Sequence, residues 1–232
     1  MKYFGEGLSE LHKELNEIIR KKNEVIAAKE LFTAIHSKLH TAEVYDTGSN
    51  EVDVLLGDLQ PHEYRIMPTA KDETIAWVLW HITRIEDLTM NYLVAESRQV
   101  FDSDWKKKLN TPIADTGNAL TDHEIMDLSS RLNIEILKSY RNAVGKRTAE
   151  IVKTLTAEDM KRKVSLQGLN QIKAAGGVTE QESSLYLLDF WGKKDIAGIL
   201  LMPPTRHMIL HLNDCCKWKA HIRAGKKCFQ QS

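Results

Sequence analysis

The sequence predicts an all-α protein, an up-down-down-up-type four-helix bundle with short additional helices in the connections. Apolar residues recur with a period near 3.6 in four long stretches, and proline and glycine fall mainly between these stretches. The chain has 232 residues, of which 42% are hydrophobic and 28% charged, an ordinary composition for a globular protein. We therefore expect one helical domain over residues 1–232.

The first long helix is predicted over Leu8–Leu39, where apolar residues keep the helical period for more than eight turns. The polar segment 46–50 breaks this pattern. A short helical turn is expected over Val52–Leu59, and either Asn50 or Asp53 opens it.

The second long helix is predicted from about Asp72 to Ala95, with acidic residues in the first turn, where the helix dipole favours them. Its apolar residues form a core stripe, which Trp77 and Trp80 widen on both sides. Surface helices are rarely this apolar, so we expect this helix to be central.

A long connection over residues 97–120 follows, with Trp105 on a short helix. Thr121–Glu124 has the capping-box pattern and opens a third helical region that continues to Leu155. A slip in the apolar spacing near Ser129–Ser130 indicates a bend or a break.

The last part of the chain alternates short elements with one long helix. Residues 166–178 contain three glycines and are expected to form a loop, and a short helix follows from Ser183 or Ser184 through Trp191. Residues 196–202 form a further turn. Pro203 and Pro204 are then expected to restart the chain as the fourth long helix, because proline fits a first helical turn.

Composition argues against several functional classes. Lys+Arg and Asp+Glu both number 32, and this zero net charge disfavours binding to nucleic acid. The longest apolar run, Ile196–Met202, is too short to cross a membrane, and the N-terminus lacks the pattern of a signal peptide. Cys215, Cys216 and Cys228 include no C-x-x-C pair, so we expect a reduced, cytoplasmic protein.

Three histidines form the strongest candidate site. His207 and His211 lie four residues apart on the last predicted helix and therefore share one face. His81 interrupts the very apolar second helix. If the two helices are neighbours, the three imidazoles can hold a divalent metal and leave a fourth position open.

The same residues have simpler interpretations. A second pair with this spacing, His36 and His40, ends the first predicted helix and has no third partner of comparable burial in the pattern. A single H-x-x-x-H pair is therefore weak evidence for a metal. His81 taken alone is more often a core histidine satisfied by a hydrogen bond, and spacing does not show that it meets the pair.

A family resemblance supports the metal hypothesis. The segment Thr-Ile-Ala-Trp-Val-Leu-Trp-His81-Ile-Thr-Arg-Ile-Glu-Asp, together with His207-Met-Ile-Leu-His211-Leu, resembles the DinB-like superfamily. The resemblance implies a helical bundle, a homodimer, and zinc or nickel held by His81, His207 and His211. It also implies thiol-dependent transfer or metal-assisted hydrolysis of a small molecule.

The chain departs from that family's pattern in two places. Its connections over 97–120 and 165–195 are long, and the segment Asn213–Lys219 of the last helix has no histidine where relatives often carry one. Asp214 and His221 are therefore alternative ligands.

Charged residues that follow His81 have two interpretations. A carboxylate of Glu86 or Asp87 could orient a ligand imidazole or act as a base, whereas Arg84 and these carboxylates could simply form salt bridges. No motif identifies a catalytic residue. The competing hypothesis is a non-catalytic bundle with structural histidines, which acts through dimerisation or a protein partner.

Overall fold

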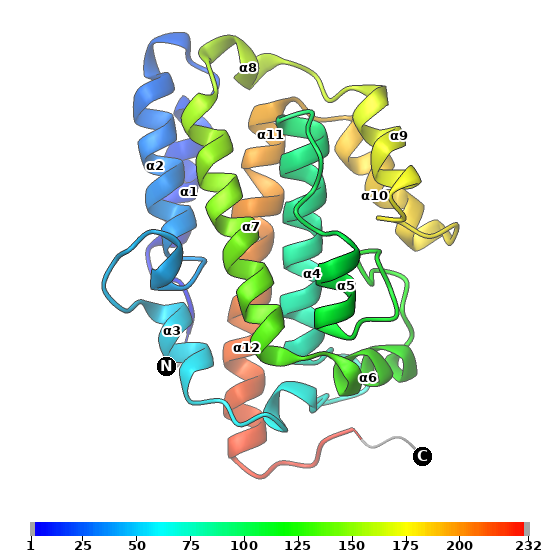
Figure 1. Cartoon of the computed structure of the whole chain (residues 1–232). Coiled ribbons are helices and arrows are strands. Elements are labelled where there is room, and N and C mark those ends of the chain that lie inside the picture. The colour runs from blue at the N-terminus through cyan, green and yellow to red at the C-terminus, as the bar shows by residue number, and fades with distance from the viewer. Residues whose placement is uncertain (1–2, 230–232) are drawn as a thin grey trace.

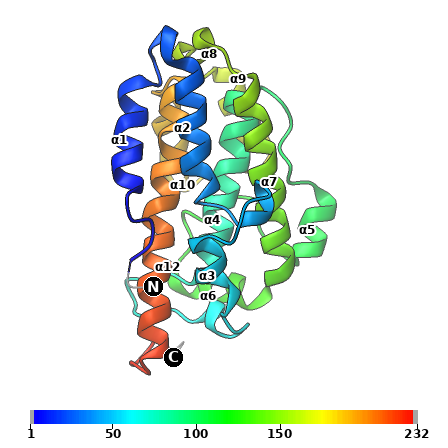
Figure 2. The same cartoon turned by 90° about the vertical axis from the view of Figure 1, so that its left-hand side faces the viewer.

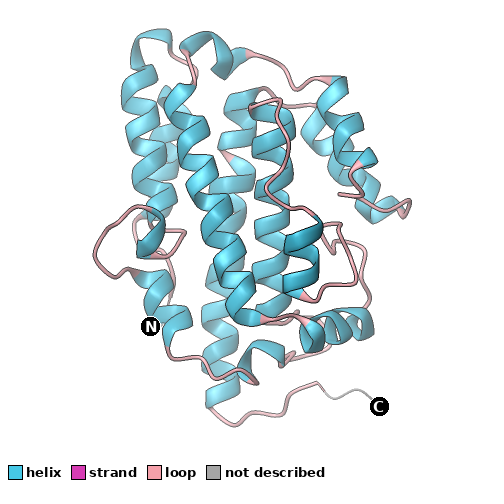
Figure 3. Cartoon of the chain, viewed as in Figure 1, coloured by secondary structure: helices cyan, strands magenta, loops and turns pink. Residues whose placement is uncertain are grey.

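The computed structural model describes residues 3–229, and this part of the chain consists of helices joined by loops (Figure 3). Extended backbone pairs within it only at an isolated bridge between Lys163 and Asp195. The all-α class predicted from the sequence is therefore confirmed. The twelve α-helices of this part of the chain are α1 Leu8–Ile18, α2 Val25–Ser37, α3 Glu51–Gly57, α4 Ile75–Leu88, α5 Ser103–Leu109, α6 Asp122–Arg131, α7 Ile134–Thr154, α8 Ala157–Lys161, α9 Leu166–Ala174, α10 Glu182–Gly192, α11 Ile196–Leu200 and α12 Met208–Arg223.

Short non-α turns complete the helices. Two π-helical stretches, Thr89–Val94 and Met202–His207, extend α4 and join α11 to α12. Three 3₁₀ turns lie at Lys22–Glu24, Ala42–Val44 and Glu63–Arg65.

Helix starts follow the capping residues of the sequence. The Asn50 side chain accepts hydrogen bonds from the backbone N–H groups of Val52 and Asp53, so α3 begins after Asn50 as expected. Thr121 forms the predicted capping box of α6. Thr74 caps α4 through the N–H of Trp77. These side chains satisfy N–H groups that a helix leaves unpaired at its N-terminus.

α4 is the central helix, as its composition predicts. All 14 of its residues are buried, and it packs against α7 and α12, with α6 near one end (Figures 1 and 2). The buried apolar residues form one cluster that draws on helices from α1 to α12. The up-down-down-up order of the four-helix bundle stays a prediction, as does the single domain over residues 1–232.

The predicted helix over Leu8–Leu39 is two helices rather than one. α1 ends at Ile18, the chain turns through residues 19–24, and α2 packs back against α1 (Figure 2). Each half has one apolar face, and turning back lets each half bury that face against the other and the core. The apolar period continues through the turn, so the pattern alone did not reveal the reversal.

Two other predictions are corrected near the C-terminus. Residues 166–178 are not a loop, because α9 occupies Leu166–Ala174 and Ser165 caps it through the N–H of Gly168. Pro203 and Pro204 do not begin a new helix. They lie in the π-helical stretch, and the chain runs from α11 into α12 as one rod (orange to red in Figure 1).

The remaining predicted breaks agree with the structure. The third helical region divides at Leu132–Asn133, close to the expected position near Ser129–Ser130. Trp105 lies on α5, and α10 covers the predicted short helix. Within residues 3–229, each helix is too short or too polar to cross a membrane.

Candidate metal centre

A short segment, residues 114–117, lies along one face of α4 and is bound to it by hydrogen bonds. We call this segment the strap. Four α4 side chains at positions i, i+3, i+4 and i+7 donate hydrogen bonds to main-chain carbonyls of the strap, at donor–acceptor distances of 2.8–3.2 Å. The donors are Trp77, Trp80, His81 and Arg84, and the acceptors are Gly117, Asp115, Thr116 and Ala114, respectively. Trp77 and Trp80, which the sequence predicted as core residues, therefore also hold the strap against α4.

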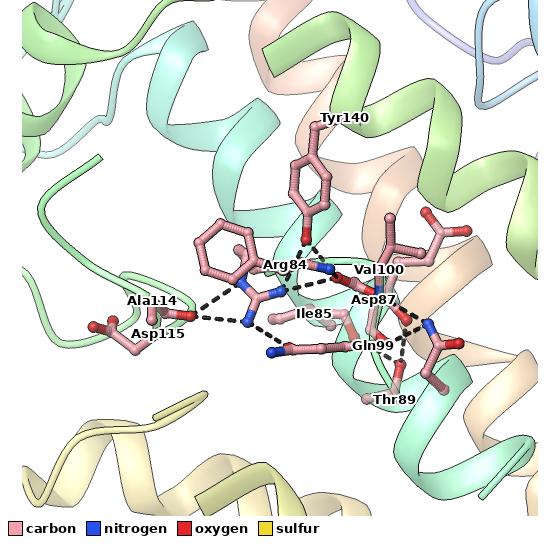
Figure 4. Close-up of polar contacts among 12 residues, drawn as sticks. Arg84, Ile85, Asp87, Thr89, Gln99, Val100, Ala114, Asp115 and Tyr140 are labelled. Atoms are coloured by element: carbon pink, nitrogen blue, oxygen red, sulfur yellow. Dashed lines mark hydrogen bonds and ion pairs between the residues drawn. The ribbon is translucent and has the colours of Figure 1, made fainter. Parts of the chain in front are cut away.

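Arg84 connects the strap to the interior (Figure 4). Its guanidinium donates to Asp87 at 3.0 Å, to the Tyr140 hydroxyl at 2.8 Å and to Gln99 at 2.9 Å, in addition to Ala114. The salt-bridge interpretation is thus correct for Arg84 and Asp87. The arginine fork satisfies several acceptors at once, which a buried charge requires.

The bond between His81 and the strap fixes the protonation of the imidazole. His81 Nδ1 lies 2.8 Å from the carbonyl oxygen of Thr116, and a carbonyl can only accept. Nδ1 therefore carries the proton and Nε2 carries the lone pair. Trp77 stacks on the ring at 4.4 Å between centroids and limits its rotation. This is the oriented, neutral form in which histidine binds metals.

The structure brings His207 and His211 to His81. One ligand nitrogen from each of the three residues lies within 4.8 Å of the others. The ring centroid of His81 lies 5.1 Å from that of His207 and 5.2 Å from that of His211, and the centroids of the pair itself are separated by 4.5 Å. His81 therefore meets the His207–His211 pair, which the sequence spacing alone did not show.

Burial keeps these imidazoles neutral. Burial and, to a smaller extent, the neighbouring His211 lower the pKa of His81 to about 3. Burial also lowers the pKa of His207 and of His211. Nδ1 of His207 is buried and lacks a hydrogen-bond partner among the described residues, and so does Nδ1 of His40. Such a state costs free energy unless some group approaches the nitrogen. Three neutral imidazoles with one nitrogen each in the cluster fit a Zn²⁺ or Ni²⁺ ion.

The alternative ligands lie outside this cluster. Asp214 pairs with Lys217 at 2.8 Å, and His221 Nε2 contacts the main-chain oxygen of Lys227 at 3.2 Å. The three-histidine group does not include them.

Comparison with known families matches residues 45–180, more than half of the chain, to the DinB superfamily. The chain belongs to the DinB superfamily. The match includes His81 and ends before His207 and His211, so the support for this pair is geometric. No match is found among curated proteins.

This DinB superfamily member contains a second group with ligand spacing. His36, His40 and Glu86 are all fully buried, and a ligand atom of each lies within 4.8 Å of the others. The expectation that the His36–His40 pair has no equally buried third partner was wrong. Glu86 fills that place from α4, 50 residues away in the sequence from His36.

The protons in this second cluster are arranged differently. Glu86 Oε1 lies 2.7 Å from His36 Nε2, and Glu86 Oε2 lies 3.1 Å from His40 Nε2. Burial alone would raise the pKa of Glu86, but His40 and His36 hold it below its ordinary value, so the carboxylate is ionised and accepts. His36 Nε2 therefore donates, and His36 Nδ1 accepts from the Tyr45 hydroxyl at 2.7 Å.

The two clusters differ in their readiness for a metal. The His36 nitrogen that contacts Glu86, Nε2, carries a proton. The His81 nitrogen that does not contact Thr116, Nε2, carries a lone pair. A dication at the second cluster would also lie near the buried guanidinium of Arg141, which interacts electrostatically with Glu86 and His40. The spacing of the ligand atoms would allow a metal at either cluster. The positions of the imidazole protons and the nearby Arg141 favour the cluster at His81.

Proposed function

We propose that this DinB superfamily member binds a divalent metal, zinc or nickel, through His81, His207 and His211. The observation that carries the proposal is the hydrogen bond from His81 to Thr116, which leaves Nε2 as the lone-pair nitrogen of an imidazole that lies beside His207 and His211. A three-histidine set leaves a coordination position for a small molecule, as in metal centres that perform catalysis.

We further propose that the centre acts on a small molecule, by thiol-dependent transfer or by hydrolysis. A bound zinc or nickel ion would supply Lewis acidity that activates water or a thiolate. The chain's own contribution is orientation and exclusion of water. The strap fixes His81, Trp77 covers its ring, and burial keeps all three imidazoles unprotonated.

The alternative function is a non-catalytic bundle that acts through dimerisation or a protein partner. In that case the histidines would serve only the fold. The four-helix arrangement and the homodimer belong to either proposal, and sedimentation tests the homodimer. The convergence of three neutral imidazoles on one point favours the metal over a purely structural role.

Elemental analysis tests the metal proposal directly. Purified protein is loaded with Zn²⁺ or Ni²⁺, desalted and compared with His211→Ala and with His221→Ala, a control on the same helix outside the cluster. We expect about one metal ion per chain in the wild type and the control, and a loss of most of it in His211→Ala. Absence of stoichiometric metal from the loaded wild type would contradict the proposal.

A further inference from the structure

An apolar pocket adjoins the candidate metal centre at His207. The pocket has a volume of about 200 Å³, and His207 is part of its wall. We call it the α10 pocket. Ile85 of α4 lines it one turn after His81, and Met202 and Pro203 line it from the π-helical stretch that ends at His207. Two elements that supply metal ligands therefore also build this pocket.

The other lining residues come from α10. Leu187, Phe190, Trp191 and Tyr186 line the pocket, and Tyr186 is 58% exposed. α10 lies beside the main helices rather than among them (Figure 1). This helix lies in the long connection over residues 165–195 and outside the residues 45–180 that match the family.

The lining has a definite chemical character. Among the described residues that line it there is no Asp, Glu, Lys or Arg, and His207 is the only histidine. A charged group would lose hydration there without a partner, whereas an apolar group would gain by leaving water. Apolar cavities of about 150 Å³ accommodate benzene, so a pocket of about 200 Å³ suits one aryl ring or a branched alkyl group.

We infer that the small molecule bound at the His81–His207–His211 centre carries an aryl or branched alkyl group, and that this group occupies the α10 pocket. The inference rests on the proposed metal centre. It assigns substrate selectivity to Phe190 and Met202, which belong to the pocket and not to the ligand set. Occupancy of the pocket beside a ligand imidazole is typical of small-molecule sites, in which apolar walls hold the ligand and few polar groups orient it.

The test uses imidazole and 4-phenylimidazole as probes on the Ni²⁺-loaded full chain. Both can enter an open coordination position, but only the second carries a ring for the pocket. Calorimetry gives the ratio of their dissociation constants in wild type, Phe190→Gln, Met202→Gln and Leu166→Gln. Leu166 is 72% exposed on the neighbouring α9 and lies outside the pocket, so it provides the control.

We expect 4-phenylimidazole to bind at least roughly tenfold more tightly than imidazole in the wild type and the control. We expect this preference to shrink severalfold in both pocket variants, whose folding is checked by circular dichroism and whose metal content is measured. An equal ratio in all metal-loaded proteins would overturn the inference and leave the metal proposal intact.

Two further outcomes separate the alternatives. A wild type that takes up no metal overturns the metal proposal and this inference with it. Sedimentation of the same variants distinguishes a different occupant. If Phe190→Gln and Met202→Gln convert a dimer to a monomer while the probe ratio stays unchanged, the pocket holds a second copy of the chain and the inference is wrong.

Discussion

His81 Nδ1 lies 2.8 Å from the main-chain oxygen of Thr116, 35 residues later in the chain. This contact joins the most deeply buried member of the histidine cluster to a strap without helical structure. The contact places the proton on Nδ1 and leaves Nε2 free to bind a metal, and it depends on the position of one carbonyl group. The integrity of residues 114–117 is therefore expected to control metal affinity.

Gly117 provides a way to disturb the strap without altering a histidine. Its φ is +73°, and an added Cβ would lie 2.8 Å from Trp77 Nε1. We expect Gly117→Ala to weaken metal binding about 10- to 100-fold by displacing the carbonyl that orients His81. Gly48→Ala is the control, since a Cβ added there would meet nothing within 4 Å and the φ of Gly48 is not positive. Equal affinities in competition titrations would argue against control by the strap.

Arg84→Lys is predicted to destabilise the fold. The guanidinium bonds the strap, Asp87, Gln99 and Tyr140 together, and an ammonium group cannot reach this set of acceptors. We expect the free energy of unfolding to fall by about 3 kcal/mol or more. Arg98→Lys, at an exposed position, should change it little. Urea denaturation measures both, and an unchanged midpoint in Arg84→Lys would contradict the prediction.

Glu86→Gln separates the two histidine clusters. Removing the carboxylate charge leaves buried Arg141 without its electrostatic partner and puts an amide against the His36 imidazole. We therefore expect the free energy of unfolding to fall by about 3 kcal/mol or more. Glu158→Gln removes an exposed ion pair with Lys22 and should have little effect.

The same variant reports on metal content. Because the proposed ion lies at His81, Glu86→Gln that remains folded should retain about one ion per chain. Loss of that ion from a folded Glu86→Gln variant would place the metal at the His36–His40–Glu86 cluster instead.

The buried His40 predicts a loss of stability in acid. Burial lowers its pKa to about 3, although Glu86 acts to raise it. The unfolded chain takes up a proton below the ordinary pKa of about 6.5, while the folded chain does so only near 3. The free energy of unfolding should therefore fall between pH 6.5 and pH 3, by about 1.4 kcal/mol per pH unit for one such group.

His40→Gln tests this origin of the acid sensitivity. Urea denaturation of chelator-treated protein at about pH 7 and about pH 5, on either side of the ordinary histidine pKa, should show a smaller loss in His40→Gln than in the wild type. His62→Gln, at an exposed position, should match the wild type. An equal loss in all three proteins would assign the acid sensitivity to other groups.

Local signals in the sequence predicted much of the helical order. Asn50 and Thr121 marked helix starts because their side chains bond backbone N–H groups a few residues away. Periodicity did not reveal the reversal after Ile18, because it records which positions are apolar and not which way the chain runs. α9 was missed because Gly168 lies within its first turn and three glycines occur over residues 166–178.

The site was predicted only in part. His81, His207 and His211 could be chosen from residue type and spacing, and the fold brings them together. The strap could not be predicted, because its main-chain carbonyls have no sequence signature. Glu86 was considered for the neighbourhood of His81, yet it faces His36 and His40, since one helix presents successive side chains to different neighbours.

The most direct test of the metal proposal is a crystal structure of the Zn²⁺- or Ni²⁺-loaded protein, with anomalous scattering measured on both sides of the metal edge. We predict one strong peak at about 2.0–2.1 Å from Nε2 of His81, with nitrogens of His207 and His211 as the other protein ligands. No peak at this cluster, or a peak at His36, His40 and Glu86 instead, would contradict it.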